Sequence, residues 1–468
     1  MIRNQNIGLI ILICIFLTGC TTMEPKYSRP KSPVPEHWPD QSLIKETSGV
    51  QAADVAWADF YRDEHLCQVI KMALENNRDL KIATLNIEKA QALYQIQRSE
   101  LFPSLNLPAG FSKQHIPADV SGIGRERTSE QYTVSLGVSS WEIDFFGRIR
   151  SLKESMLEQY LATEQAKHSI QISLVGSVAT AYMNLAASQA YLKLAQDTLD
   201  NQTAYYQLIR SRVEKGIASE LEASQAQTRV EAARVDVARY TNQVAASENM
   251  LNLLVGTPVP KELLPNMLND HLMREDLTAG ISSEVLLYRP DVLMAENQLK
   301  AANANIGAAR AAFFPNISLT GTYGTMSTEL SGLFKGRSDT WSFVPQIVQP
   351  IFDAGARRQR LKVAQVDREI YLAQYEKAIQ TAFREVADNL VERSTLVEQL
   401  AAQEALVKSS EEAFRLATLR YTEGITNYLN VLDTQRSLYS AQQGLLAVRL
   451  ARNLNLILFY KVLGGGAF

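Results

Sequence analysis

The chain has 468 residues, of which 46% are hydrophobic and 21% charged, and its 47 basic and 50 acidic residues give a formal net charge of −3. This composition excludes a disordered or collagen-like chain, and the balanced charge without a Lys/Arg-rich run argues against a nucleic-acid partner. Beyond the first twenty residues we find no apolar stretch near the ~20 residues that a membrane helix needs, so we expect no helical membrane span.

The amino terminus is typical of an exported protein. Arg3 precedes an apolar run over residues 7–17, and Leu17-Thr18-Gly19-Cys20 follows. Residues 1–19 are therefore predicted to be a signal peptide. The last four of these residues resemble the bacterial lipobox, which implies cleavage before Cys20 and a covalent lipid on that cysteine. An ordinary signal peptide followed by a chance cysteine is the alternative.

Cysteine count excludes a disulfide framework. Cys14 leaves with the signal peptide and Cys20 is expected to carry lipid, so Cys67 has no partner within the chain. After Cys20, prolines at 25, 30, 33, 35 and 39 prevent a helix. We predict a lipidated, Pro-rich arm over residues 20–62 that acts as a tether or wraps around the body of the protein.

The rest of the chain is a repeat of one pattern. Asn77-Arg78-Asp79-Leu80 corresponds to Arg289-Pro290-Asp291-Val292 at an offset of 212, and residues 212–217 correspond to residues 420–425 at an offset of 208. The four-residue difference arises around residues 115–130 and 328–339, as expected for a loop. We predict a first repeat over 63–275 and a second over 276–468.

Each repeat contains two segments in which apolar residues alternate with small polar ones. Alternation with a period of two predicts strands, which we place at about 104–114, 131–143, 316–326 and 340–351. Pro108 and Pro345 each remove a ladder donor, so we interpret them as strand ends or bulges. The alternation also slips near Ser139-Ser140.

These strands are long enough to cross a membrane. A tilted membrane strand needs ~9–11 residues, whereas the smallest barrels use about eight strands. A small soluble subdomain is the commoner meaning of alternation, but the export signal favours a membrane barrel. Four strands cannot close such a barrel alone, so several chains must share it, and a trimer would supply twelve strands.

Long helices fill most of each repeat. Residues 149–214 and 356–423 contain no proline, and a helix of that length spans roughly 100 Å. Shorter return helices are predicted over 219–255 and 427–462. Gly216 and Gly424 should end the long helices in the left-handed conformation. Ser219 with Glu222 forms a predicted capping box, and Asn427 is the corresponding cap.

Particular stretches resemble the outer-membrane efflux lipoproteins of the TolC and OprM type. They are Arg289-Pro290-Asp291, the block Ala302-Asn303-Ala304-Asn305-Ile306-Gly307-Ala308-Ala309-Arg310-Ala311-Ala312-Phe313-Phe314-Pro315, and residues 420–436. The resemblance covers residues 17–468. It implies a mainly α fold with a membrane β-barrel, in which a homotrimer forms a twelve-stranded barrel and an α-helical barrel.

The resemblance also implies a function and partners. The chain would be the outer-membrane exit duct of a tripartite efflux pump in a Gram-negative bacterium. It would be anchored by lipid and extend into the periplasm, and it would conduct small molecules such as drugs. The implied partners are a periplasmic adaptor, an inner-membrane transporter of the RND type and outer-membrane lipid, with no nucleic acid.

Two sites are implied near the helical turns. Leu429 and Asp433 share a helix face, and the resemblance places them with Arg420 and Tyr421 at a periplasmic gate. Taken singly, Leu429 could instead pack within the helical wall, and Arg420 could form a solvent-exposed ion pair. The resemblance further implies adaptor-binding tips at Gly216, Ile217, Ala218, Gly424, Ile425 and Thr426, although a plain turn would need no partner.

No enzyme active site is evident in the sequence. His37, His65, His115, His168 and His271 are scattered without metal-ligand spacing, so we expect no catalytic residues, no metal and no cofactor besides the lipid. Three alternatives remain for the function: a TolC-like duct for type I protein secretion, metal-ion efflux, and a structural coiled-coil lipoprotein without a pore.

Overall fold

The computed structural model describes residues 22–38, 50–52, 55–268, 272–278 and 282–465 of the chain. The predicted signal peptide and Cys20 lie outside these residues. The described chain forms two compact units, and the boundary between them falls within four helices. Among the described residues, unit 1 comprises 22–31, 86–164 and 294–375, and unit 2 comprises those within 32–85, 165–293 and 376–465.

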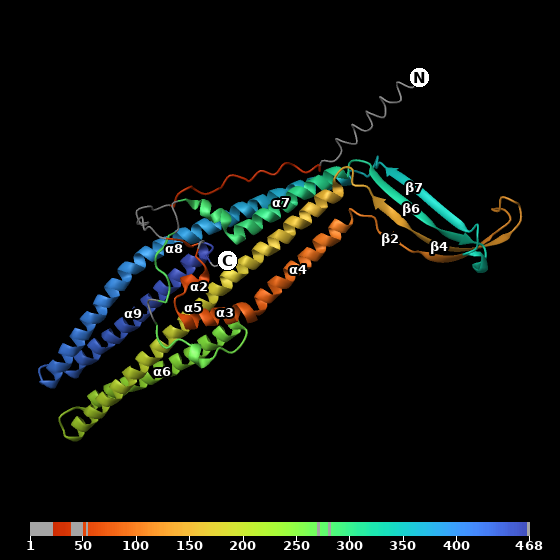
Figure 1. Ribbon diagram of the computed structural model, residues 1–468. Helices are drawn as coiled ribbons and strands as arrows, with labels where there is room; N and C mark the ends of the chain where they lie inside the picture. Colours follow the sequence, from red (N-terminus) through yellow and green to blue (C-terminus); the bar gives the residue numbers. More distant parts are fainter. Residues whose placement is uncertain (1–21, 39–49, 53–54, 269–271, 279–281, 466–468) are drawn as a thin grey trace. The chain divides into compact units, whose positions relative to one another are not determined.

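The six main helices confirm the internal repeat (Figure 1). Each repeat has a helix of 22 residues before the strands, a helix of 67 residues after them, and a return helix of 36 or 35 residues. In chain order they are α4 (Arg78–Ser99), α5 (Arg148–Glu214), α6 (Glu220–Val255), α7 (Pro290–Ala311), α8 (Ala356–Thr422) and α9 (Tyr428–Val462). The ends of α5, α6, α8 and α9 lie within one residue of the predicted ranges.

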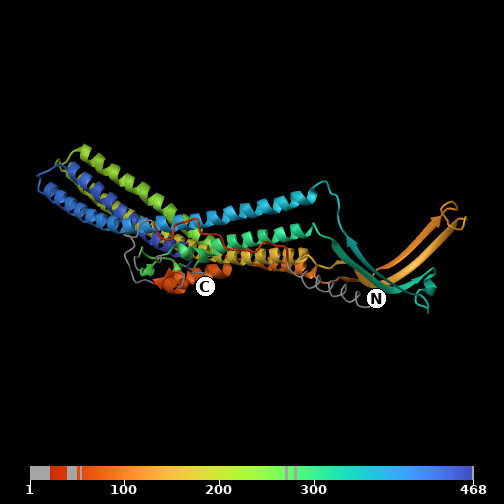
Figure 2. The same ribbon diagram turned by 90° about the horizontal axis from the view of Figure 1, so that it is seen from above.

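Unit 1 contains the main β-sheet, which is antiparallel throughout. Its strands are β2 (Leu105–Asn106), β3 (Ala109–Ile116), β4 (Arg127–Glu142), β6 (Asn316–Ser327) and β7 (Asp339–Val348). β2 and β3 both pair with one edge of β4. β6 pairs with the other edge of β4, and β7 pairs with β6. The hairpins β3–β4 and β6–β7 lie side by side in both views (Figure 1, Figure 2). β2 with β3 and β7 are therefore the two outer strands.

Two of the three irregularities predicted for the sheet are confirmed, and one prediction was wrong. Pro108 lies between β2 and β3, where its carbonyl accepts a hydrogen bond from the Ser135 N–H at 3.1 Å, so it does end a strand. The slip is confirmed by a register shift between Val138 and Trp141, with Ser140 at a φ of 52°. Pro345, in contrast, pairs with Leu319 inside β7 without any shift, so its interpretation as a strand end or bulge was wrong. An outer strand tolerates the missing donor.

One helix contains a longer apolar stretch than we expected from the sequence. α5 contains an 18-residue window with a mean hydropathy of 1.3, enough to cross a membrane by length and composition. Our statement that no such stretch follows residue 20 was therefore too strong. Within the structure 67% of that window is buried, as in the core helix of a protein without membrane helices, because apolar residues on all faces pack against neighbouring elements.

Unit 2 has a small aromatic core around its shorter elements. These are α2 (Trp57–Phe60), α3 (Glu64–Asn76), the 3₁₀ helices η2 (Lys261–Leu263) and η3 (Ser283–Tyr288), and the parallel pair β1 (Val50–Gln51) and β5 (Leu277–Thr278). The 3₁₀ helix η4 (Leu330–Gly332) belongs to the β6–β7 loop of unit 1. Phe60 stacks on Tyr460 with ring centroids 4.1 Å apart, and the Tyr460 hydroxyl donates to the Val55 carbonyl at 2.6 Å. This packing fixes the end of α9.

Candidate functional site

One face of the main sheet is apolar and exposed. Leu136, Tyr323 and Trp341 form a row across β4, β6 and β7, and their exposed fractions are 47%, 67% and 73%. Phe343 and Ile347 continue this face along β7, at 63% and 68%. Contiguous exposed apolar surface of this kind marks a surface that contacts membrane or another protein.

The opposite face of the sheet is richer in small polar residues, although Met326, Val344 and Val348 are exposed on it. The hydroxyls of Thr322 and Ser342 meet at 2.7 Å across β6 and β7. At Gly137 and Gly324 an added Cβ would lie within 2.3 Å and 2.1 Å of backbone carbonyl oxygens on the neighbouring strand. Glycine is therefore required at these two positions, where the strands approach closely. The more polar face is the better suited to contact with water.

The turns between the long and return helices have the same geometry in both repeats. Gly216 and Gly424 have φ values of +73° and +72°. The Ile217 N–H donates to the Arg212 carbonyl and the Ile425 N–H to the Arg420 carbonyl, at 2.8 and 2.9 Å. Together with the glycine N–H bonds to Val213 and Tyr421, these bonds form a Schellman motif in each turn.

The tips of these turns differ in their caps and expose apolar side chains. Ser219 and Glu222 form the predicted capping box, whereas Asn427 occupies the N-cap position of α9 without a side-chain capping bond, so that part of the prediction was wrong. Ile217 and Ile425 are 71% and 65% exposed. The structure therefore places the predicted tip residues on two equivalent, accessible turns.

A buried cluster in unit 2 joins the two helical hairpins near their turns. Tyr428 is 1% exposed and packs with Val431 and Leu432 of α9 against Ile209 of α5 and two alanines of α6, Ala223 and Ala226. The Tyr421 ring lies 5.3 Å from that of Tyr428, and the Arg212 guanidinium lies 5.3 Å above the Tyr421 ring. Burial raises the pKa of Tyr428 to about 12, so its hydroxyl stays protonated.

The predicted gate residues occupy different positions around this cluster. Tyr421 packs on it, whereas Arg420 is exposed and Leu429 is 58% exposed. Asp433 pairs with Arg436 at 2.6 Å on the surface of α9. Within the described residues of this one chain, no hydrogen bond joins Arg420 to Asp433. Sequence reasoning missed Tyr428 and Arg436, although both lie inside the block that carried the family resemblance.

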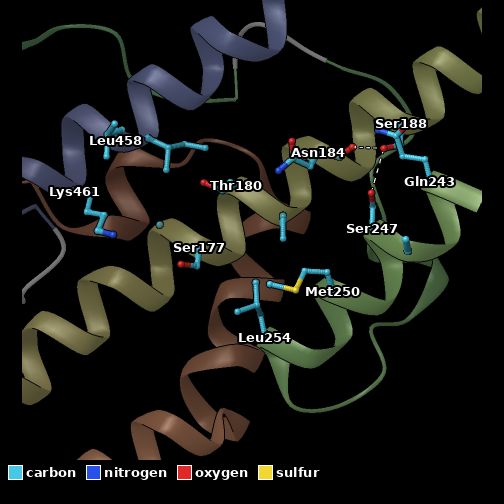
Figure 3. A pocket seen from close by; sticks show the side chains of 14 residues that line it. Ser177, Thr180, Asn184, Ser188, Gln243, Ser247, Met250, Leu254, Leu458 and Lys461 are labelled. Atoms are coloured by element: carbon cyan, nitrogen blue, oxygen red, sulfur yellow. Dashed lines mark hydrogen bonds between the residues drawn. The ribbon is translucent and has the colours of Figure 1, made fainter. Parts of the chain in front are cut away.

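A cavity of about 540 Å³ lies elsewhere in unit 2, between α5, α6 and α9. Its walls carry small hydroxyl and amide side chains, and Figure 3 shows the Ser188 and Ser247 hydroxyls joined across two helices, at 3.2 Å. Lys461 is the one charged side chain among its lining residues. No carboxylate, histidine or cysteine is among its lining residues.

The chain is similar to known proteins over almost its whole length. A family model described as outer membrane efflux protein matches residues 69–257 and 281–465. The chain is 45% identical over 460 residues to a toluene efflux pump outer membrane protein, TtgC, of Pseudomonas putida, covering 98% of this chain and 95% of that protein. It is equally similar, at 45% identity and the same coverage, to the antibiotic efflux pump outer membrane protein ArpC of Pseudomonas putida.

A solved structure shows the same similarity. The open state of the Neisseria gonorrhoeae MtrE outer membrane channel matches with a TM-score of 0.87 and 38% sequence identity, covering 96% of this chain and 99% of that one. The match extends over strands and helices alike, because both chains are covered almost completely.

Proposed function

Because this chain belongs to the outer membrane efflux protein family, we propose that three copies of it build one exit duct for a tripartite efflux pump. The protein is an efflux channel component of the Gram-negative outer membrane, and its relatives are channel and transport proteins rather than enzymes. The observation that carries a barrel shared between copies is the sheet of unit 1, which has an exposed apolar face and two outer strands.

Strand number requires more than one chain. β2 and β3 are two parts of one strand, so each copy brings four strands, whereas the smallest closed membrane barrels have about eight. Pairing β7 of one copy with β2 and β3 of the next is antiparallel, as within the chain, and removes both open edges. Three copies give twelve strands, with the apolar face toward lipid and the small polar face toward water.

The transported molecules follow from the relatives' names. Toluene and antibiotics are the substrates that the names of TtgC and ArpC give. We assign small, largely apolar organic molecules to this chain. The polar face of the sheet presents mainly Ser, Thr and Gly, with Arg127 and Glu142 as charged residues of β4. The duct itself therefore selects little, and an inner-membrane transporter, of the RND type, selects the molecules and supplies the energy.

The helical tips are the proposed contact for a periplasmic adaptor. Ile217 and Ile425 are exposed at equivalent turns, and their neighbours Gly216, Ala218, Gly424 and Thr426 are small, so a partner helix could approach closely. Gly216→Glu combined with Gly424→Glu should abolish capture of the adaptor by the immobilised trimer. Undiminished capture would remove the tips from the interface.

Arg420, Tyr421, Leu429 and Asp433 are the proposed gate. Leu429 and Asp433 are both exposed on α9, so a trimer would repeat them as an apolar ring and a carboxylate ring. Asp433→Ala with Arg420→Ala should raise the single-channel conductance of the resting trimer. A conductance equal to that of the unchanged protein would show that other residues close the duct.

Cys20 is the proposed lipid attachment site. The lipobox resemblance supports it, and the mature chain then begins at this cysteine. The mass of the intact mature protein tests the assignment, because acylation of the sulfur and amine adds the mass of the acyl groups, and Cys20→Ala should lose that increment. If the natural mature protein had the mass of the unacylated chain, lipid attachment at Cys20 would be refuted.

A further inference from the structure

The two repeats differ on one helix face. Glu296, Asn303, Gly307 and Arg310 lie along one side of α7, at spacings of seven, four and three residues. Glu296, Asn303 and Gly307 are buried, whereas Gln91 and Gln95 of α4, which occupy the positions of Asn303 and Gly307 in the first repeat, are exposed. We call the four α7 residues the anchor clamp.

The anchor clamp covers the backbone of the segment Thr22–Arg29. The Asn303 side-chain amide donates to the Pro25 carbonyl at 2.7 Å, and the Arg310 guanidinium donates to the Met23 carbonyl at 3.2 Å. An added Cβ at Gly307 would lie 2.7 Å from the Glu24 backbone nitrogen. The same Cβ would lie 2.6 Å from the Ser151 hydroxyl of α5, so glycine at position 307 lets both the segment and α5 approach α7. Figure 1 shows the segment as a red trace that runs beside α7.

An ion pair between the half-buried Arg29 and the buried Glu296 fixes the other end of the segment. Glu296 is 2% exposed and accepts two hydrogen bonds from Arg29, at 3.1 and 2.7 Å, and one from the Tyr27 hydroxyl at 3.1 Å. Lys300 lies 3.6 Å from the same carboxylate and 5.6 Å from the centre of the Tyr27 ring. A buried carboxylate needs these partners, and the segment supplies most of them.

The segment ends next to the start of α5. An added Cβ at Gly147, which precedes the first residue of α5, would lie 2.8 Å from the Thr22 Cα. Cys20 is two residues before Thr22, so covalent geometry keeps its Cα within about 7 Å of that of Thr22. Ile351 and Phe352, between β7 and α8, are each 87% exposed at the corresponding junction of the second repeat. Exposed apolar side chains of this kind mark a surface that contacts membrane or another protein.

We propose that the anchor clamp is a docking site for the chain's own Thr22–Arg29 segment, and that it holds the lipid on Cys20 at the junction between strands and helices. The clamp thereby sets the depth at which the lipid enters the inner leaflet. This role rests on the proposed lipidation, whereas the docking does not.

The docking is tested by trypsin cleavage of the full mature protein in detergent. The Lys26–Tyr27 bond lies inside the segment, and each fragment can be followed by mass spectrometry. Arg29→Ala and Glu296→Gln should each speed cleavage at this bond about tenfold, because each removes the ion pair on the buried Glu296 side chain and so raises the population of the undocked segment. Since both changes break one contact, the double variant should be no faster than the faster single variant.

Matched variants in the first repeat serve as controls. Gly307→Ala should also speed cleavage. Gln95→Ala and Arg98→Ala should not, because these residues of α4 occupy the positions of Gly307 and Arg310 in the first repeat. Rates equal to that of the unchanged protein for both Glu296→Gln and Gly307→Ala would overturn the docking site. Rate increases that multiply in the double variant would show that Arg29 and Glu296 act independently, which also contradicts the clamp.

The lipid role has a separate measurement. A fluorophore on Thr22→Cys in a Cys67→Ser background, with Cys20 acylated, is quenched by lipids brominated at known depths. In the natural sequence we expect quenching to peak at a single shallow depth. In Glu296→Gln the profile of quenching against bromine depth should be at least twofold broader. Equal profiles would overturn the positioning role. An unacylated Cys20 would refute both that role and the lipid attachment, but it would leave the trypsin result and the channel function standing.

Discussion

Tyr428 gives the sharpest test of how the hairpins are held together. Its ring is 1% exposed at the start of α9 and packs on Ile209 of α5 and Ala223 of α6. Tyr428→Ala removes this ring and leaves a cavity between the two hairpins. Aromatic-to-alanine changes in cores destabilise by about 3–5 kcal/mol. Because the cluster lies near the turns, most of this loss should appear as local opening rather than global unfolding.

Hydrogen exchange measures that opening directly. A loss of about 3 kcal/mol corresponds to a population of the open tip on the order of 100-fold larger. Backbone amides of residues 428–434 should therefore exchange on the order of 100-fold faster in Tyr428→Ala, whereas amides of α7 should keep their rates. Tyr428→Phe retains the ring and serves as the control. Unchanged exchange near the tip in Tyr428→Ala would refute the view that this cluster joins the hairpins.

Three further predictions concern the gate, a turn and the anchor clamp. Leu429→Ala should increase resting conductance in planar bilayers, whereas Leu221→Ala, at the equivalent and similarly exposed position of the first repeat, should leave it unchanged; equal effects would contradict a gate specific to the second repeat. Gly424→Val forces a β-branched residue to a φ of +72° and should destabilise the turn by about 1–2 kcal/mol, seen as faster amide exchange at this tip than at the other. Burial opposes ionisation of Glu296, but its bonds to Arg29 and the charge of Lys300 hold its pKa below the ordinary value. Docking of the segment should therefore be strongest above about pH 4.3 and be lost as the pH falls through the lowered pKa. Pepsin cleavage within residues 22–29 should rise over that pH range in the natural protein and depend less on pH in Glu296→Gln.

Local sequence signals predicted the helices well. Gly216 and Gly424 fixed the ends of α5 and α8, because a left-handed residue stops a helix whatever the surroundings. The strands were predicted less closely. β4 begins at Arg127, four residues before the expected start, since a paired partner strand extends it. Pro345 was misjudged because its effect depends on whether its strand lies at an edge, which only the sheet order shows.

Contacts between distant parts of the chain could not be predicted. The Pro-rich arm indicated a tether or a wrapping arm, but its pairing of Arg29 with Glu296 joins residues 267 positions apart. The block around Asn303 and Gly307 was recognised only as a family signature, and its contact with the arm explains why those residue types are needed. At the tips, the surface pairing of Asp433 with Arg436 follows from an i, i+3 spacing that the sequence analysis did not consider.

The shared barrel is tested most directly by measuring mass and conductance on one sample. Native mass spectrometry of the protein in mild detergent should give three processed chains per particle, and the same preparation should form channels in a planar bilayer. A particle of one chain that conducts nothing would contradict the account, because the sheet of unit 1 would then have some other way to cover its apolar face and its two outer strands.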